Sequence, residues 1–513
     1  MRVLFYHDPV YELGQPFFWK YFVRWTSQMR AGLDGVQCRF LLADHLVDHA
    51  RQSGVPEDEM VPVREDRFRA FVEQRTGNWN SFWYERRYSD DSLRRAASFL
   101  GRALGSFVPD VILTHTPAPF LRTLFPSAVL LHFEAGLMKF PPFPMSFYFD
   151  PCGFFRDSWP VKHVETLRVL GLTREQQQEI DGLRAFFTEE LLRPSSPFRP
   201  VMDEEGKRFR RKVLVPLQFN RFFGFDSQCP FASQFEFLRW VLDRTPSDIG
   251  VVVTQHVYFE TLEPEAFAFL RSRHPNLIYH PVFSDYNTAS QFLCADVDAI
   301  VTGSSSVGLQ SLWWRLPLVA VGETHLSAIA DGSDPAQLHQ IIDAGWPSWK
   351  DALLHWYLTR YCPLESYVMS GPWLRSFLGR MHQDPDTFPL IDEEPELFRR
   401  IRADAIRDIG RATPSAARSF ELLASERQRA LEALREELEQ RGALIDRLSS
   451  ELEQRAALID RLSSELEQRA AVIEELRIEA ERRAVLIEEL TLAVREREGR
   501  LAQFEALRER MRS

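Results

Sequence analysis

Short apolar runs alternate with helical patterns between residues 210 and 322, and this alternation constrains the fold more than any other feature of the sequence. The runs are RRKVLVPLQF (210–219), IGVVVTQH (249–256), NLIYHP (276–281), VDAIVTG (297–303) and PLVAVG (317–322). Helical patterns such as FEFLRWVLD and PEAFAFLRSR separate them. Continuously apolar strands that alternate with helices are typical of a parallel sheet covered on both faces. We therefore predict a doubly wound α/β domain in this part of the chain.

The first part of the chain shows the same alternation more weakly. Val3–Tyr6 is a short apolar run and Phe17–Met29 has a helical pattern, followed later by PDVILTH (109–115), APFLRTLF (118–125) and SAVLLHFEAG (127–136). We predict two Rossmann-like domains, at residues 1–165 and 211–412, joined by a helical linker at 166–210. The aromatic-rich segment 347–412 is expected to supply helices that close the second domain or cross back over the first. Two such domains place a ligand cleft between the carboxyl ends of their sheets.

The last part of the chain is a repeat with a period of two heptads: ELEQRGALIDRLSS, ELEQRAALIDRLSS and ELEQRAAVIEELRI. Apolar residues occupy each a position from Leu438 through Ile445 and Leu452 to Leu501, whereas position d alternates leucine with arginine. An unbroken apolar a position is typical of a coiled coil, and polar layers at d fix its register. We predict a coiled coil over residues 413–513 that self-associates through residues 431–501.

Composition excludes several classes of function. The net charge of −11 and the pI near 5.7 argue against a broad nucleic-acid surface, so no nucleic-acid partner is predicted. The 5 cysteines are scattered and form no C-x-x-C pair, which argues against a disulfide framework and a zinc motif. MRVLFYHDPV lacks the apolar stretch of a signal peptide, and no apolar window approaches the ~20 residues that span a bilayer. We expect a cytoplasmic protein that is at most attached to the surface of the inner membrane.

Three serines, Ser304, Ser305 and Ser306, stand where a predicted strand ends and a predicted helix begins. The first turn of a helix leaves backbone N–H groups unpaired, and the helix dipole favours an anion there. Simple capping requires only one serine, whereas three in a row at the carboxyl end of a strand also fit phosphate binding. Both interpretations stay open at this point.

Two histidines stand in similar positions. His256 ends the strand VVVTQH and His280 ends NLIYH, so both precede loops at the carboxyl ends of strands. An imidazole can donate a hydrogen bond to a phosphate or a carboxylate. A histidine at a strand end is commonly structural, and Pro281 after His280 is ordinary at a strand exit. Both residues are candidate ligand contacts, with a structural role as the alternative.

Two acidic residues are candidates for catalysis. Glu134 lies in HFEAG (132–136) at the end of an apolar strand, and Asp226 lies in the loop QFNRFFGFDSQ (218–228). An acid at the mouth of an apolar strand is costly unless it is solvated or used. Two carboxylates that face each other across a cleft suit chemistry at an acetal centre, where one stabilises or attacks and the other handles a proton. The alternative for Asp226 is a turn or cap ahead of the helix that begins near Ser233.

Several of these motifs together resemble the capsule polysaccharide biosynthesis family, which includes bacterial β-Kdo transferases of capsule and lipopolysaccharide assembly. The motifs are VLVPLQ…D (213–226), QH (255–256), ADVDAIVTGSSSVGLQSLWWRLPLVAVG (295–322) and FEAG (133–136). The resemblance implies a GT-B fold, with the acceptor on the first domain and the nucleotide sugar on the second. It implies retaining transfer of Kdo from CMP-Kdo, without a metal or other cofactor; lipid-linked glycan acceptors are expected.

The resemblance also implies roles for individual residues. Asp226 would be the nucleophile, Glu134 the acid/base, and His256 with Ser304–Ser306 the ligands of the CMP phosphate and ribose. Gln218, the last residue of VLVPLQ, and His280 are further substrate-binding candidates.

Two alternatives stay open beside this interpretation. Many family members have proline where this chain has Val257, and glutamate is common at the position of Gln310. These departures support a non-catalytic, transferase-like scaffold that presents its coiled coil to a membrane-surface polysaccharide assembly complex. The other alternative is a glycosyltransferase that uses a different nucleotide sugar. In the transferase interpretation the coiled coil is an oligomerising stalk or a ruler of chain length.

Overall fold

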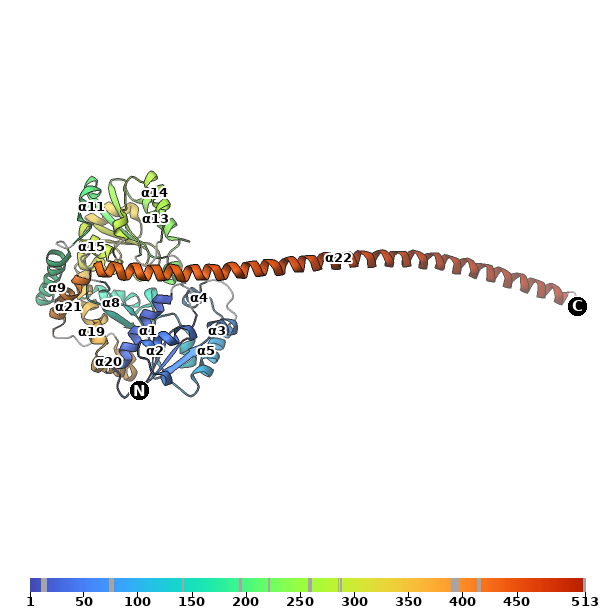
Figure 1. Cartoon of the computed structure of the whole chain (residues 1–513), viewed down its shortest axis with the longest axis horizontal. Coiled ribbons are helices and arrows are strands. Elements are labelled where there is room, and N and C mark those ends of the chain that lie inside the picture. Colours follow the sequence, from blue (N-terminus) through green and yellow to red (C-terminus); the bar gives the residue numbers. More distant parts are fainter. Residues whose placement is uncertain are drawn as a thin grey trace. The chain divides into compact units, whose positions relative to one another are not determined.

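The computed structural model describes residues 1–10, 16–72, 78–140, 143–192, 196–219, 222–256, 261–284, 286, 288–388, 396–412 and 417–510. Side chains are described for these residues except 16–18, 387, 409–412, 417–438 and 440. The chain divides into two compact units, Met1–Ala416 and Ala417–Ser513. Figure 1 shows the two sheets of the first unit and the single helix of the second.

The first unit begins with a six-stranded sheet of order β3-β2-β1-β4-β5-β6. Neighbouring strands are parallel except β6, which runs antiparallel to β5 at the edge. The strands are β1 (Arg2–Tyr6), β2 (Gln37–Ala43), β3 (Met60–Val63), β4 (Val111–Thr114), β5 (Val129–Ala135) and β6 (Phe147–Asp150). β4 is buried at each of its four positions, as expected for a strand with helices on both faces.

Helices cover both faces of this sheet. They include α1 (Pro16–Ala31), α2 (Val47–Gln52) and α5 (Asp90–Leu104). The side chain of Ser89 caps α5 by accepting a hydrogen bond from the Ser92 N–H, and Gly105 ends the helix with φ +60°, which a residue with a side chain rarely adopts. These local signals fix where the helix starts and stops, so its apolar face packs on the sheet.

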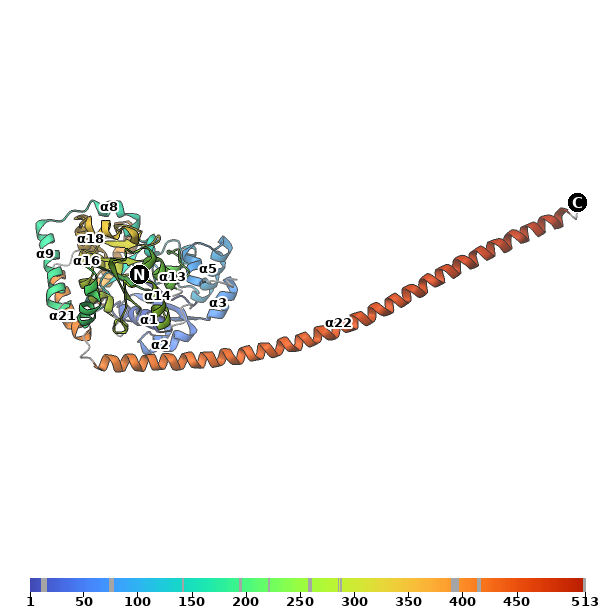
Figure 2. The same cartoon turned by 90° about the horizontal axis from the view of Figure 1, so that it is seen from above.

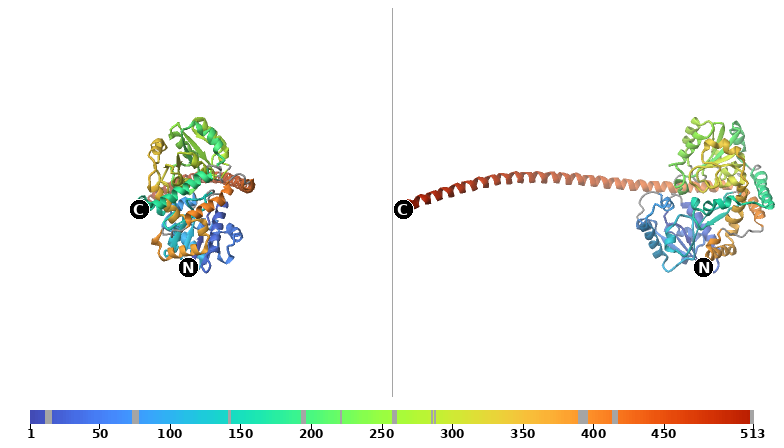
Figure 3. Two further views of the ribbon diagram at one scale, coloured as in Figure 1. Left: turned by 90° about the vertical axis from the view of Figure 1, so that its left-hand side faces the viewer. Right: turned by 180° about the vertical axis from the view of Figure 1, so that it is seen from behind.

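The second sheet has five parallel strands in the order β11-β10-β7-β8-β9. They are β7 (Arg211–Pro216), β8 (Ile249–Thr254), β9 (Leu277–Ile278), β10 (Ala299–Thr302) and β11 (Leu318–Ala320), with α13 (Gln234–Arg244), α14 (Pro264–Arg273), α15 (Ala289–Leu293) and α16 (Val307–Trp314) between them. Each predicted strand of this region is present, although β9 is shorter than its apolar run. In the left view of Figure 3, the green and yellow lobe that contains this sheet lies above the blue lobe that contains the first sheet.

Helices after residue 348 return the chain to the first sheet. They are α18 (Trp349–Trp356), the π-helix η9 (Tyr357–Tyr361), α19 (Glu365–Val368), α20 (Gly371–Gln383) and α21 (Leu397–Ala412). α20 packs against α1 where Gly371 meets Gly32: a Cβ at Gly371 would lie 2.1 Å from the Gly32 carbonyl oxygen. Only glycine permits this contact, so α20, late in the unit, packs closely against α1 near its beginning.

The second unit is the helix α22 (Ala417–Arg510), drawn without a break in Figure 2. Its apolar a positions are exposed in the single chain, for example Ile445 at 62%, Leu452 at 68% and Ile459 at 62%. Glu479 and Arg483, four residues apart on the helix, form an ion pair at 2.8 Å. No helix in the described residues has the length and apolar character required to cross a membrane.

These elements confirm the predicted fold class: a GT-B-like pair of Rossmann-type sheets followed by a long C-terminal helix. The antiparallel strand β6 is the departure from the expected parallel pattern.

Candidate functional site

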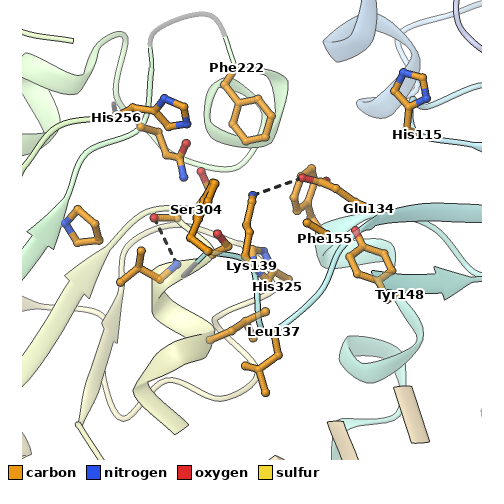
Figure 4. A pocket seen from close by; sticks show the side chains of 18 of the residues that line it. His115, Glu134, Leu137, Lys139, Tyr148, Phe155, Phe222, His256, Ser304 and His325 are labelled. Atoms are coloured by element: carbon orange, nitrogen blue, oxygen red, sulfur yellow. Dashed lines mark hydrogen bonds and ion pairs between the residues drawn. The ribbon is translucent and has the colours of Figure 1, made fainter. Parts of the chain in front are cut away.

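A cavity lies between the carboxyl ends of the two sheets (Figure 4). Residues that follow β4 and β5 form one wall, and residues that follow β7, β8 and β10 form the other. This is where paired Rossmann-type sheets place a ligand. The lining includes polar residues from both sheets: Asn80, His115, Glu134, Lys139, Tyr148, Gln218, His256, Gln291, Ser304, Ser305, Ser306 and His325.

The first wall carries one charged pair. Glu134 lies near the end of β5, where the extended strand gives way to the turn that leads to Lys139, and Lys139 Nζ lies 3.9 Å from Glu134 Oε1. Both side chains keep 25% of their surface exposed. Burial raises the pKa of Glu134, and the charge of Lys139 opposes this shift. A half-buried carboxyl with a raised pKa is suited to accept and return a proton.

Tyr148 stands beside this pair because β6 is antiparallel to β5. The sheet register places Tyr148 directly opposite Glu134. Tyr148 stacks on Tyr361 of the π-helix η9 with ring centres 5.6 Å apart, and the Tyr361 hydroxyl donates to Asp150 Oδ2 at 2.7 Å. Asp150 also accepts from the backbone N–H of Trp159. The Tyr148 ring next to Glu134 therefore packs on Tyr361, whose hydroxyl is bonded to the buried carboxylate of Asp150.

The three serines of the second wall differ in their contacts, which bears on the two expected roles of helix capping and phosphate binding. Ser305 is the structural one: its N–H donates to Thr302 Oγ1, and its Oγ accepts from the Val307 N–H at 3.4 Å, at the start of α16. Ser304 is only 3% exposed, and its Oγ has no hydrogen-bond partner among the described residues. Ser306 occupies the N-cap position without a side-chain cap bond. The Ser305 hydroxyl thus accepts from the first N–H of α16, and all three serines line the cavity.

His256 and Gln218 join this wall from the ends of β8 and β7. The His256 ring meets the Phe219 ring edge to face, with centres 5.2 Å apart. Burial, with a smaller effect of the Lys139 charge, lowers the pKa of His256 to about 3, so the ring is neutral at pH 7. Gln218 is held through its backbone, whose N–H donates to Gln234 and whose carbonyl accepts from Thr261. Its side chain is thereby presented at the cavity wall.

Two predicted site residues lie elsewhere. Asp226 is the last residue of α12 (Phe223–Asp226); this turn buries Phe223 and Phe225, whereas Asp226 is exposed. His280 accepts from the Val282 N–H through Nδ1 at 3.2 Å and thus caps the short helix Pro281–Phe283, which is its structural alternative. Neither residue lines the cavity. The structure brings together Glu134, Gln218, His256 and Ser304–Ser306, and the expected pair of facing carboxylates is not formed by Glu134 and Asp226.

Sequence reasoning missed several lining residues. His115 follows the strand VILT and carries the same signal that identified His256, a histidine at a carboxyl strand end. His325 follows β11, and burial together with Lys139 lowers its pKa to about 4. Lys139 and Tyr148 had no comparable signal, because their positions depend on a turn and on an antiparallel edge strand. Val257, one of the family departures, lies outside the described residues.

No group of three or more His, Cys, Asp or Glu side chains suitable for a metal ion occurs in the described ranges. The site is thus a polar cavity with one carboxylate–ammonium pair facing a hydroxyl-rich helix start. Fold and site together define a two-lobed α/β protein with a polar cavity between the carboxyl ends of two sheets.

No protein-family model matches this chain, and no curated protein matches it. Solved structures resemble it in fold. The beta Kdo 2,7 transferase KpsC of Thermosulfurimonas dismutans aligns at 13% identity and TM-score 0.35, covering 56% of this chain and 89% of that one. CalG4, the calicheamicin glycosyltransferase, aligns at 16% identity and TM-score 0.34, and the alignment covers 76% of this chain and 99% of that one. A UDP-N-acetylglucosamine 2-epimerase aligns at 12% identity and TM-score 0.31, and the alignment covers 77% of this chain and 98% of that one. These likenesses concern the fold alone.

Proposed function

We propose that this protein is a glycosyltransferase that uses a nucleotide-activated sugar. One observation carries the proposal: the buried, unpartnered hydroxyl of Ser304 at the start of α16 shares a cavity with the Glu134–Lys139 pair of the opposite sheet. The first element suits a phosphate, and the second suits proton transfer at the reacting sugar.

The donor phosphate would lie at the serine turn. The N-terminus of α16 directs unpaired N–H groups and the positive end of its dipole toward an anion. Ser304 and Ser306 add hydroxyl donors there, and neutral His256 adds one imidazole donor. The ammonium of Lys139 supplies a positive charge from the opposite wall, close to Glu134.

The transfer would proceed with Glu134 as the base. Its carboxylate takes the proton from an acceptor hydroxyl, whose oxygen forms a bond to the anomeric carbon of the donor sugar. The bond from that carbon to the phosphate oxygen breaks, and the electron pair leaves with the nucleotide. A carboxyl of raised pKa can then pass its proton to solvent and be restored.

For the donor we propose CMP-Kdo, supported by the sequence resemblance at 213–226, 255–256 and 295–322, and for the acceptor a lipid-linked glycan of capsule or lipopolysaccharide assembly. Retention would require an additional nucleophile at the anomeric carbon. The resemblance gives this role to Asp226, and it stays a prediction because that exposed residue is not among those that line the cavity.

Calorimetry on the full chain with CMP, UDP and GDP tests the donor site. We expect CMP to bind, and Ser304→Ala to weaken it while Ser272→Ala, at a remote hydroxyl bonded to the Phe269 carbonyl, leaves it unchanged. Preference for UDP or GDP would support the alternative of another nucleotide sugar. Binding of none of the three would contradict the transferase and favour the scaffold.

α22 is proposed to self-associate with a second copy. Its exposed stripe repeats along the described part of the helix, with Ile473 at 65% and Ile487 at 62% exposure. Burial of one such side chain contributes roughly 1.5–3 kcal/mol. Ile459→Asp with Ile473→Asp should therefore yield monomers in light scattering, whereas Glu467→Gln with Glu481→Gln, on the same helix outside the stripe, should not. An assembly unchanged by the double isoleucine variant would contradict this.

A role as a ruler of polysaccharide length is a separate proposal, motivated by the two-heptad repeat. Deletion of one repeat of ELEQRAALIDRLSS should shorten the product distribution. An unchanged distribution would leave α22 as a stalk only.

A further inference from the structure

A recess on the first-sheet side of the cavity contains polar atoms that the donor chemistry does not use. We define the recess by Trp19, Phe22, Asn80, His115 and Thr116, all of which line the cavity. His115 is 5% exposed and Asn80 is 2% exposed. Within the described part of the chain, neither ring nitrogen of His115 nor the Oδ1 of Asn80 has a hydrogen-bond partner. Buried polar groups are normally bonded, so these atoms indicate a ligand.

The recess is electrically neutral. Burial, together with nearby His7, holds the pKa of His115 well below its usual range, and burial lowers the pKa of His7 to about 3. A neutral imidazole offers one donor and one acceptor nitrogen. Among the described lining residues Lys139 is the one permanent cation, and it is engaged by Glu134. A carboxylate or phosphate in the recess would be buried without a counter-charge, which is costly.

Aromatic rings form the rest of the recess. The Phe22 ring stacks on His115 with centres 3.9 Å apart and planes 8° apart, and the Trp19 ring lies 4.4 Å from His115. These contacts hold the His115 ring, while neither of its in-plane nitrogens has a hydrogen-bond partner among the described residues. Apolar walls with a few placed hydrogen-bonding groups are typical of small-molecule sites. A hydroxyl group, which both donates and accepts, matches a neutral imidazole and an amide oxygen that line the same cavity.

The geometry points to a subsite for a neutral pyranose: the recess binds the terminal sugar of the acceptor, with its hydroxyl groups between His115 and Asn80. The inference rests on the proposed function, because a transferase requires an acceptor sugar on the Glu134 side of its cavity. It adds that this sugar carries no acidic group. The competing occupant is ordered water, which can also satisfy buried polar atoms.

Saturation-transfer NMR on the full chain tests the subsite, using methyl α-mannopyranoside, methyl β-galactopyranoside and the methyl glycoside of glucuronic acid, each with and without CMP. His115→Phe and Asn80→Leu remove the polar atoms at nearly constant volume. Ser81→Ala is the matched control, since Ser81 lies on the same helix α4 (Trp79–Tyr84), is equally 2% exposed and has an unpartnered Oγ among the described residues, but does not line the cavity.

We expect a neutral glycoside to bind the wild type and Ser81→Ala, with affinity about fivefold to tenfold lower in His115→Phe and Asn80→Leu. Thermal unfolding of His115→Phe should stay at or above the wild-type temperature, because unbonded polar atoms are removed. If His115→Phe does not fold, Asn80→Leu alone decides. The subsite would be overturned in favour of water if the glucuronide bound as strongly as the neutral glycosides. It would also be overturned if His115→Phe and Asn80→Leu both left the affinity for the neutral glycosides unchanged. Absence of sugar binding while CMP binds would also overturn it and leave the proposed donor site standing, whereas sugar binding without CMP binding contradicts the donor site instead.

Discussion

The two walls of the cavity differ in chemistry although both are built from the carboxyl ends of Rossmann-type sheets. The first wall carries the charged pair Glu134–Lys139 beside Tyr148, and the second presents neutral donors from Ser304, Ser306 and His256. The difference follows from the local structure. A strand that leads directly into a helix exposes backbone N–H groups and hydroxyls, whereas β5 leads into a turn and the antiparallel strand β6. The proposed function accordingly assigns proton transfer to the first wall and anion binding to the second.

Glu134→Gln should have the largest effect of the substitutions considered, and this effect should be on the transfer rate. The amide keeps the size of the side chain but cannot accept a proton, so the transfer rate should fall about 10²–10⁴-fold. Nucleotide binding should change little, because the donor site lies on the other wall. Steady-state transfer and CMP calorimetry on the same preparation check both halves, and equal losses in rate and CMP affinity would contradict the division of roles.

Ser304→Ala should produce the opposite pattern. A hydroxyl bonded to a charged phosphate contributes about 1.5–3 kcal/mol, so CMP affinity should fall roughly tenfold to a hundredfold. Stability should not fall, since this Oγ has no partner in the described chain. The neighbouring substitution Ser305→Ala is the control: it removes the bond to the Val307 N–H and should cost about 1 kcal/mol of unfolding free energy. Equal destabilisation by both substitutions would show that Ser304 also has a structural role.

The second wall was easier to predict from the sequence than the first. Continuous apolar runs mark β7, β8, β10 and β11, and the serines and His256 directly follow two of them. β2 and β3 escaped prediction because QCRFLLA contains an arginine and MVPV a proline, which weaken the apolar signal. Tyr361 reaches the cavity from more than 200 residues after Glu134 in the sequence, through the π-helix η9, and no local periodicity encodes such a contact.

Asp226 lies outside the cavity lining, and no local pattern in the sequence indicated this position. α12 is a single turn, and four residues are too few for a periodic pattern to show which side faces the core. His115, in contrast, carried a usable signal, a polar residue immediately after a buried strand.

Lys139→Met should change the pH dependence of the transfer rate, through its effect on Glu134 in the first wall. The charge of Lys139 opposes the burial that raises the pKa of Glu134, so its removal should raise this pKa further. A base works only when deprotonated; the acidic limb of the rate profile should therefore move to higher pH, by about one unit or less for a half-exposed pair. The pKa values of His256 and His325 should rise as well, because Lys139 now lowers both. A limb that moves to lower pH would contradict Glu134 as the base.

Asp226→Asn should have the smallest effect, and it decides between two arguments. The sequence resemblance makes Asp226 a nucleophile, which would require its carboxylate at the anomeric carbon. Its exposed position at the end of α12, outside the cavity lining, predicts instead that rate and CMP affinity change by no more than about twofold. Rapid-quench measurement of a single turnover checks this, with Asp243→Asn as an exposed control on α13. A loss comparable to that of Glu134→Gln would mean that Asp226 takes part in the transfer, and the second wall would then contribute to the chemistry as well as to binding.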